Sequence, residues 1–134
     1  MGTDRPTAPQ PRFIQPGSIF WFKSEGQDNE QQKETPWVVV SGPEYHSRMK
    51  LVLAVPMTYE DIAEQPFYVS VMKEDVRSFA AALHPLSTKR HLRMIKAGNL
   101  RHFSIERVDP IVGLLTNRAV IIRVHDEILK AVGL

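Results

Sequence analysis

The chain has 134 residues and a mass of 15.3 kDa, which predicts one folding unit rather than separate cofactor and substrate lobes. Its 43% hydrophobic and 24% charged residues are typical of a globular protein, and no apolar run reaches the roughly 18 residues of a membrane span. The absence of cysteine excludes disulfides, thiol catalysis and a cysteine zinc site. The first residues lack the apolar core of a secretory signal, so we expect a cytoplasmic location.

The net charge of +2 is unevenly distributed along the chain. Residues 1–76 carry seven Lys and Arg against eleven Asp and Glu, whereas residues 77–134 carry ten against four. Between Arg77 and Arg107 seven basic residues accompany a single acidic one, Glu106. Such a block either attracts a polyanion, because neutralised phosphates release counterions, or forms a solvated face.

The chain begins with a stretch that predicts a flexible tail over residues 1–15, because the first 16 residues contain four prolines among polar neighbours. We expect one domain over residues 16–134. Apolar and β-branched runs predict strands at 19–22, 37–40, 51–55, 67–72 and 102–105, with a weaker candidate at 80–83. The continuous runs at 37–40 and 51–55 favour strands buried on both faces.

Two connections stand out between the predicted strands. Residues 23–34 contain no apolar side chain, which predicts an exposed loop of functional length, and residues 42–48 form a turn-like segment. From Thr116 the apolar period becomes helical, with Thr116 or Asn117 as N-cap and Gly133 beyond the last turn. Val124 and Ile128 should face the core. The sequence thus predicts a small, mainly β barrel or sheet closed by a C-terminal amphipathic helix.

Common cofactor and metal motifs are missing from the sequence. It contains no GxxxxGK[ST] phosphate loop, no GxGxxG and no HExxH, and its five histidines are scattered. We therefore expect no metal site, and an enzyme built on this chain should work without a cofactor.

The order of several short motifs resembles the toxins of the MazF/PemK family. Residues 17–22 (GSIFWF) begin the match, followed by a polar loop ending NEQQKETP, the strand-like WVVVS, and LVLAVPMT. The ending IVGLLTNRAVIIRVHDEILKAVGL is similar to the family's closing turn and helix. The resemblance covers about residues 16–75 and 110–134, while 76–109 form a divergent basic segment.

This resemblance implies an SH3-like barrel of the CcdB/PemK type with a C-terminal helix, assembled as a homodimer. It implies a type II toxin that cleaves single-stranded RNA without metal or other cofactor. It also implies a partner, an antitoxin whose acidic disordered tail covers the RNA groove.

Carried over residue by residue, the resemblance places Glu30 and Gln31 on the family's Glu-Gln and Pro36 on its proline. The family's catalytic arginine falls on Thr35, whose single hydroxyl cannot replace a guanidinium. Lys33 is a candidate replacement cation, and Thr58 matches the threonine of the V-P-x-T element, although a strand-end threonine can also serve a local backbone group. His84 is a candidate acid or base in the segment 81–88.

The implied reaction is attack of a ribose 2′-hydroxyl on the adjacent phosphorus, with cationic donors stabilising the pentacovalent state. The expected catalytic residues are Thr58, Lys33, Glu30 and His84. RNA should be held by aromatic stacking and by basic or polar contacts. The expected binding residues are Trp21, Gln31, Thr35, Tyr59, Lys89, Arg90 and Arg93.

Two other hypotheses remain open at this stage. The first is a barrel of the same fold that has lost catalysis and binds a protein, as the CcdB-like gyrase poisons do, or a nucleic acid; Thr35 favours it. The second is an unrelated small β domain that forms no dimer.

Overall fold

The structure is a computed structural model that describes residues 14–23, 34–58, 66–79, 92–108 and 110–134. Most of the predicted tail, the centre of the polar loop and the weaker strand candidate at 80–83 lie outside the described residues. In the described part, no helix is long and apolar enough to cross a membrane.

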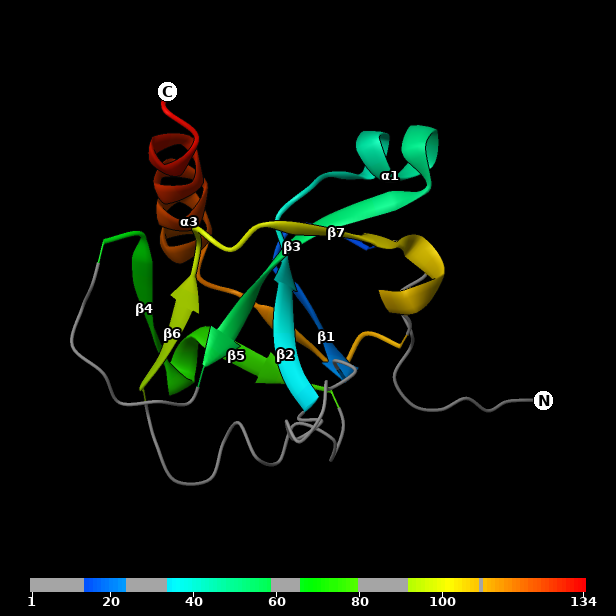
Figure 1. The fold of residues 1–134 in the computed structure, drawn as a ribbon. Helices are drawn as coiled ribbons and strands as arrows, with labels where there is room; N and C mark the ends of the chain where they lie inside the picture. Colours follow the sequence, from blue (N-terminus) through cyan, green and yellow to red (C-terminus); the bar gives the residue numbers. More distant parts are fainter. Residues whose placement is uncertain (1–13, 24–33, 59–65, 80–91, 109) are drawn as a thin grey trace, which may run out of the picture.

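Eight antiparallel strands form a nearly closed sheet within the described residues (Figure 1). They are β1 (Ser18–Lys23), β2 (Glu34–Val39), β3 (Leu51–Thr58), β4 (Tyr68–Met72), β5 (Val76–Ser78), β6 (Leu92–Lys96), β7 (Arg101–Ser104) and β8 (Gly113–Leu115). Their order is β4-β6-β3-β2-β1-β8-β5, and β7 pairs with β3 beside β6. The predicted mainly β barrel with a C-terminal helix is confirmed.

The central strands separate two apolar cores, as their continuous apolar sequences predicted. Val38 and Val55 belong to a first cluster, which also contains Val120 and Val124 of the helix α3 (Arg118–Ala131). Their chain neighbours Val39 and Ala54 belong to a second cluster on the other face, with Phe20 and Phe103. Because side chains alternate along a strand, β2 and β3 are buried on both sides.

The helix α3 begins and ends close to where the sequence predicted. The Asn117 side chain accepts a hydrogen bond from the Ala119 N–H at 3.0 Å, which makes Asn117 the N-cap. The Asn117 amide also donates to the buried Asp75 at 2.9 Å. Asp75 lies in the 3₁₀ helix η1 (Lys73–Asp75), and its other carboxylate oxygen accepts the Met72 N–H. Through these two hydrogen bonds Asp75 connects the start of α3 to the end of β4.

The predicted turn at 42–48 is wrong, because the helix α1 (Pro43–Met49) occupies this stretch. A proline in its first turn favours the helix, but His46 is the single buried residue of α1. Without an apolar face the helix has no periodic signal in the sequence. The strands β5, β6 and β8 were also missed, and Ile105, predicted as strand, begins the 3₁₀ helix η3 (Ile105–Val108).

Gly17 permits the close contact that starts the sheet. Its φ is +101°, a conformation that side chains disfavour, and an added Cβ would lie 2.9 Å from the Leu115 carbonyl oxygen. Its own carbonyl accepts the Leu115 N–H at 2.8 Å. Gly17 thereby lets β8 approach β1 and bring α3 over the first core.

Candidate functional site

Thr35 and Thr58 lie at the same end of adjacent strands. The β2–β3 ladder pairs Trp37 with Pro56, and each threonine lies two residues beyond that pair on its own strand. Since alternate residues share a face, both threonines lie on the face of the second core. Both are partly exposed. Two residues that the sequence analysis assigned to the site thus come from neighbouring strands and share a face.

Trp21 lies on the opposite face of the sheet from the two threonines. It pairs with Pro36 and packs, half-buried, against the first core. Phe22 follows it and has the reverse orientation, because it pairs with Thr35 and packs against the second core. The aromatic side chain beside Thr35 is therefore that of Phe22, and Trp21, which the sequence predicts as an RNA-binding residue, lies on the other face.

Seven of the predicted site residues fall outside the described residues. They are Glu30, Gln31, Lys33, Tyr59, His84, Lys89 and Arg90. Arg93 is located by its backbone alone, in β6, where it pairs with Val71 of β4.

Four aromatic rings pack together on the face that carries Thr35. Phe103 is the centre of this aromatic cluster, with edge-to-face contacts to Phe20 at 5.2 Å and to both Phe22 and Trp37 at 4.9 Å. Phe20 and Phe103 are buried, whereas Phe22 and Trp37 are partly exposed. The rings come from β1, β2 and β7, so three strands fix their positions.

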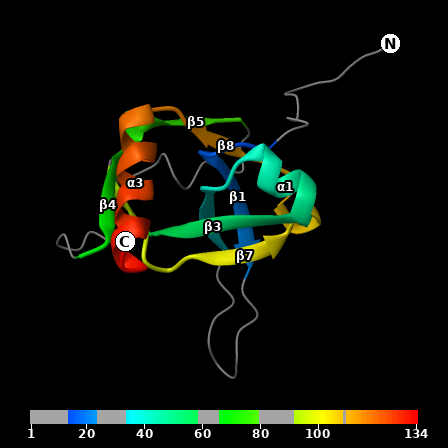
Figure 2. The same ribbon diagram turned by 90° about the horizontal axis from the view of Figure 1, so that it is seen from above.

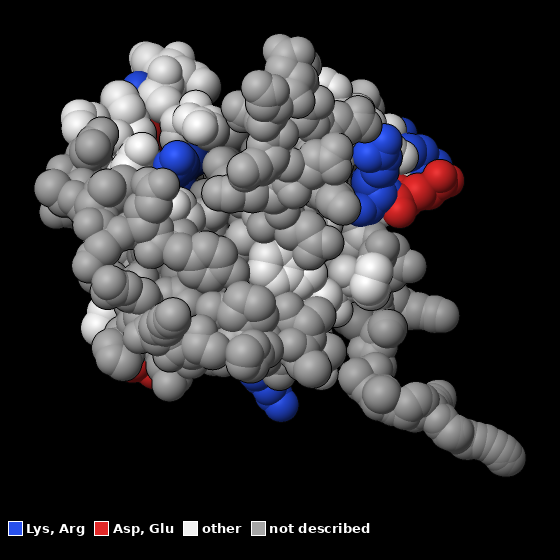
Figure 3. Space-filling model, turned by 60° about the horizontal axis from the view of Figure 1, so that its bottom comes forward, with Lys and Arg blue, Asp and Glu red and all other residues white. Residues whose placement is uncertain are grey.

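Two exposed arginines stand over this aromatic cluster. The Arg101 Cζ lies 5.1 Å from the ring centre of Phe22 and 5.0 Å from that of Phe103. The Arg107 Cζ lies 5.9 Å from the Phe22 ring. All three distances are within the range of cation–π attraction. Figure 3, in which the lower side of the molecule in Figure 1 is turned forward, shows described Lys and Arg side chains beside an acidic one at the right edge.

The sequence analysis missed Arg101 and Arg107 as site residues. Both belong to the basic block, and Arg101 lies two residues before Phe103, so an alternation of basic and aromatic residues was the available signal. Their contact with Phe22 requires β7 and η3 to approach β1, which lies about 80 residues earlier in the chain and shares no local pattern with them.

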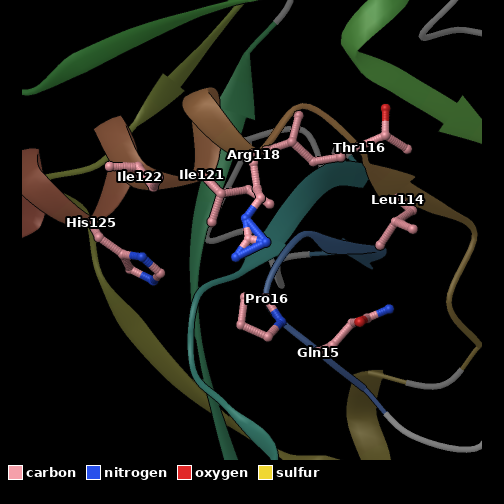
Figure 4. Close-up of a pocket in the computed structure, with 9 residues that line it drawn as sticks. Gln15, Pro16, Leu114, Thr116, Arg118, Ile121, Ile122 and His125 are labelled. Atoms are coloured by element: carbon pink, nitrogen blue, oxygen red, sulfur yellow. The ribbon is translucent and has the colours of Figure 1, made fainter.

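A pocket of about 560 Å³ lies elsewhere, between α3, β8 and the segment before β1 (Figure 4). Gln15 and Pro16 form one side, and Arg118, Ile122 and His125 of α3 form another. None of the residues predicted for the site lines this pocket. Its lining is mainly apolar and contains no acidic side chain, so we place the candidate site at the strand ends instead.

Ser41 and His46 form a buried hydrogen-bonded pair. The Ser41 Oγ lies 2.7 Å from the His46 Nε2, within hydrogen-bond distance, and accepts the Leu53 N–H at 2.9 Å. Burial lowers the pKa of His46 below the ordinary value of 6.5, and a hydrogen bond to the Ile14 backbone opposes this. The pair joins α1 to β3 and is too enclosed to serve as a nucleophile and base.

The described residues include no group of three His, Asp or Glu side chains that could hold a metal ion. The described functional groups of the candidate site are the hydroxyls of Thr35 and Thr58, the guanidinium groups of Arg101 and Arg107, and the rings of the aromatic cluster. Such groups can bind a phosphate and a stacked base.

Residues 15–130 match a family model described as the PemK-like, MazF-like toxin of type II toxin-antitoxin systems. The match runs through the basic segment at 76–109 as well as through the two regions that carried the sequence resemblance. The chain belongs to this family of toxins. A search of curated proteins gave no match.

Solved structures share the fold at low sequence identity. MazF from Deinococcus radiodurans is 18% identical with a TM-score of 0.62, over 92% of this chain and 100% of that one. An endoribonuclease from a mycobacterial species, solved with its cognate antitoxin, is 17% identical with a TM-score of 0.64, over 90% and 95%. The Mycobacterium tuberculosis toxin MazF-mt6 is 12% identical with a TM-score of 0.58, over 90% and 98%.

Proposed function

We propose that this toxin is a metal-independent endoribonuclease that cleaves single-stranded RNA in the cytoplasm. The observation that carries the proposal is the placement of Thr58 and Thr35 at one end of adjacent strands, on the face with the aromatic cluster and its two arginines. Membership of the toxin family supports it, and so does the similarity to a mycobacterial endoribonuclease.

The proposed reaction begins when a base removes the proton from a ribose 2′-hydroxyl. The oxygen attacks the adjacent phosphorus, the 5′-oxygen leaves, and a 2′,3′-cyclic phosphate forms. In this scheme the Thr58 hydroxyl donates to a phosphate oxygen as negative charge grows there. Thr35 provides a hydroxyl but no charge, so Lys33 or another cation takes the role of the family's arginine. Glu30 and His84 are the proposed acid and base.

The decisive experiment compares wild type with Thr58→Ala and Thr58→Ser on a long unstructured RNA in EDTA. We expect discrete cuts with 2′,3′-cyclic phosphate ends. Loss of the phosphate-binding hydroxyl in Thr58→Ala should slow cleavage about 100-fold or more, and Thr58→Ser should retain most activity. Full activity in Thr58→Ala would remove Thr58 from the mechanism, and intact RNA with the wild type would remove the nuclease.

A second candidate function is binding without cleavage. The observation that favours it is Thr35, because threonine lacks the planar, permanently charged group that stabilises a phosphorane. The target would then be a nucleic acid held on the arginines, or a protein, as for CcdB-like gyrase poisons. Tight RNA binding with intact product in the EDTA experiment would select the nucleic-acid form of this candidate.

We also propose two protein partners, an antitoxin with an acidic disordered tail and a second copy of this chain. Solved relatives include a MazE–MazF complex from Deinococcus radiodurans, which supports the first. The second is supported by three exposed apolar residues, Ile122 and Leu129 of α3 and its C-cap Val132, which are spaced at seven and three residues. Such spacing suits the pairing of two helices.

A further inference from the structure

We propose that Arg101 and Arg107 form the site that binds the RNA backbone beside the reacting phosphate, with the aromatic cluster as their support. This inference rests on the proposed ribonuclease function and assigns its substrate contact to residues outside the motifs of the resemblance. It makes the two arginines binding residues and leaves the chemical step to the strand ends.

The aromatic cluster gives the arginines a rigid base. Phe103 is 5% exposed and Phe20 1% exposed, and both are held in edge-to-face contacts by rings of other strands. Arg101 lies about 5 Å from two of the four rings, so its position is fixed by two contacts at once. A cation held in this way loses little freedom when it binds an anion, which improves affinity.

The charges of the two arginines are not paired with any described carboxylate. The described residues form two ion pairs, Arg48 with Glu44 and Lys130 with Glu127, and neither Arg101 nor Arg107 pairs with a described carboxylate. Cation–π contact with a ring leaves the N–H groups of a guanidinium able to donate hydrogen bonds to an anion. Phosphate is the partner that matches this planar fork.

The strand register and the contacts with Phe22 place the two arginines relative to Thr35 and Thr58. Phe22, which both arginines contact, is the pairing partner of Thr35. Arg101 pairs with Ala54, which lies four residues before Thr58 on β3 and on the same face. Four residues of a strand span about 13 Å, so Arg101 binds a neighbouring phosphate rather than the one attacked at Thr58.

The exposed rings beside the arginines favour RNA over an acidic peptide as the ligand. Phe22 and Trp37 are partly exposed next to the arginines, and single-stranded nucleic acids bind by stacking bases on such rings while cations hold the backbone. An acidic peptide would use the charges and leave the rings without a partner. In Figures 1 and 2, β7 lies along β3, which brings Arg101 to the sheet that carries Thr58, and Arg107 follows in η3 directly after β7.

The test measures binding of a fluorescent single-stranded 2′-O-methyl oligonucleotide, which cannot be cleaved because its 2′-hydroxyl is blocked. We compare wild type, Arg101→Ala, Arg107→Ala and the double variant at several salt concentrations. Arg123→Ala is the matched control, since Arg123 is an exposed arginine on α3. Each single variant should weaken binding about tenfold and reduce the salt dependence by about 0.7 per lost phosphate contact. In cleavage assays KM should rise while kcat changes little.

Each outcome decides between the two proposals. Cleavage by the wild type, together with equal binding by the double variant and Arg123→Ala, would overturn the arginine site and leave the nuclease intact. Weakened binding by the double variant without wild-type cleavage would keep the site and remove the nuclease. Loss of binding to an acidic peptide, with oligonucleotide binding unchanged, would reassign the arginines to a protein partner. Arg101→Gln replaces Arg101→Ala if thermal melting shows that the latter unfolds.

Discussion

At the scale of single residues, His46 connects folding to protonation. Its ring Nε2 forms a hydrogen bond with the Ser41 Oγ at 2.7 Å, and the Ser41 Oγ also accepts the Leu53 N–H. Only 4% of His46 is exposed, and this burial lowers its pKa below 6.5 because the charged form is poorly solvated. The unfolded chain therefore takes up a proton at a higher pH than the folded chain.

We expect the free energy of unfolding to fall as the pH decreases below 6.5 toward the folded pKa of His46. The stabilisation by His46 is fully present well above pH 6.5, where its imidazole is neutral in both the folded and the unfolded chain. Urea titrations of wild type and His46→Gln between pH 5 and 8 measure this dependence, and the other histidines cancel in the difference. Parallel curves for the two proteins would show that His46 does not contribute.

Some residues of the candidate site could be predicted from sequence and others could not. Thr58 was found because it ends an apolar strand in a short motif, and the structure places it at the end of β3. Arg101 and Arg107 were not predicted as a site, because their contact with Phe22 forms only when β7 and η3 come to lie beside β1. Trp21 and Phe22 are neighbours of similar chemistry, and only the register shows that Phe22 shares a face with Thr35.

At the scale of elements, α3 closes the first core through a narrow apolar face. Val124 is 1% exposed and Val120 8%, and Ile121 and Ile128 pack partly buried beside them. The predicted positions of Val124 and Ile128 are confirmed. Leu129 and Val132 share the helical period but are 48% and 58% exposed, so the period alone overestimates the buried face.

Replacement of Val124 by Asp should lower the free energy of unfolding by about 3 kcal/mol, because it buries a carboxylate without a partner. Arg123→Asp, at the exposed neighbouring position, should change stability by less than about 1 kcal/mol. Urea denaturation of both variants measures the difference. An unchanged midpoint for Val124→Asp would mean that α3 packs through another face.

For β1 to β4 and for α1, predictability from sequence followed the number of buried apolar residues. Strands β1 to β4 contain buried, β-branched runs and were found from sequence alone. The strand β8 contains only three residues. Its position is determined by pairing with β1, which Gly17 directly precedes, rather than by its own composition. In α1, only His46 is buried, so no hydrophobic pattern marks the helix.

At the scale of the whole molecule, the sheet and α3 cover both cores but leave one apolar surface without a described cover. Ile122, Leu129 and Val132 are 55%, 48% and 58% exposed, and Ile122 also lines the pocket beside Arg118 and His125. A symmetric dimer would use the same surface on both copies, so each α3 would shield its partner. The strand ends carrying Thr35 and Thr58 belong to other elements and would stay accessible in that arrangement.

Wild type should therefore sediment at twice the 15.3 kDa of the chain, and Ile122→Glu combined with Leu129→Glu should shift it to the monomer. Two glutamates facing their counterparts would bury like charges, which costs more than such an interface gains. Met49→Glu is the matched control, because Met49 is 51% exposed on α1 and should leave the dimer unchanged. A monomeric wild type would overturn the dimer, and an equal shift by Met49→Glu would move its interface to α1. Retention of RNA binding by the monomeric variant would further show that the arginine site is complete within one copy.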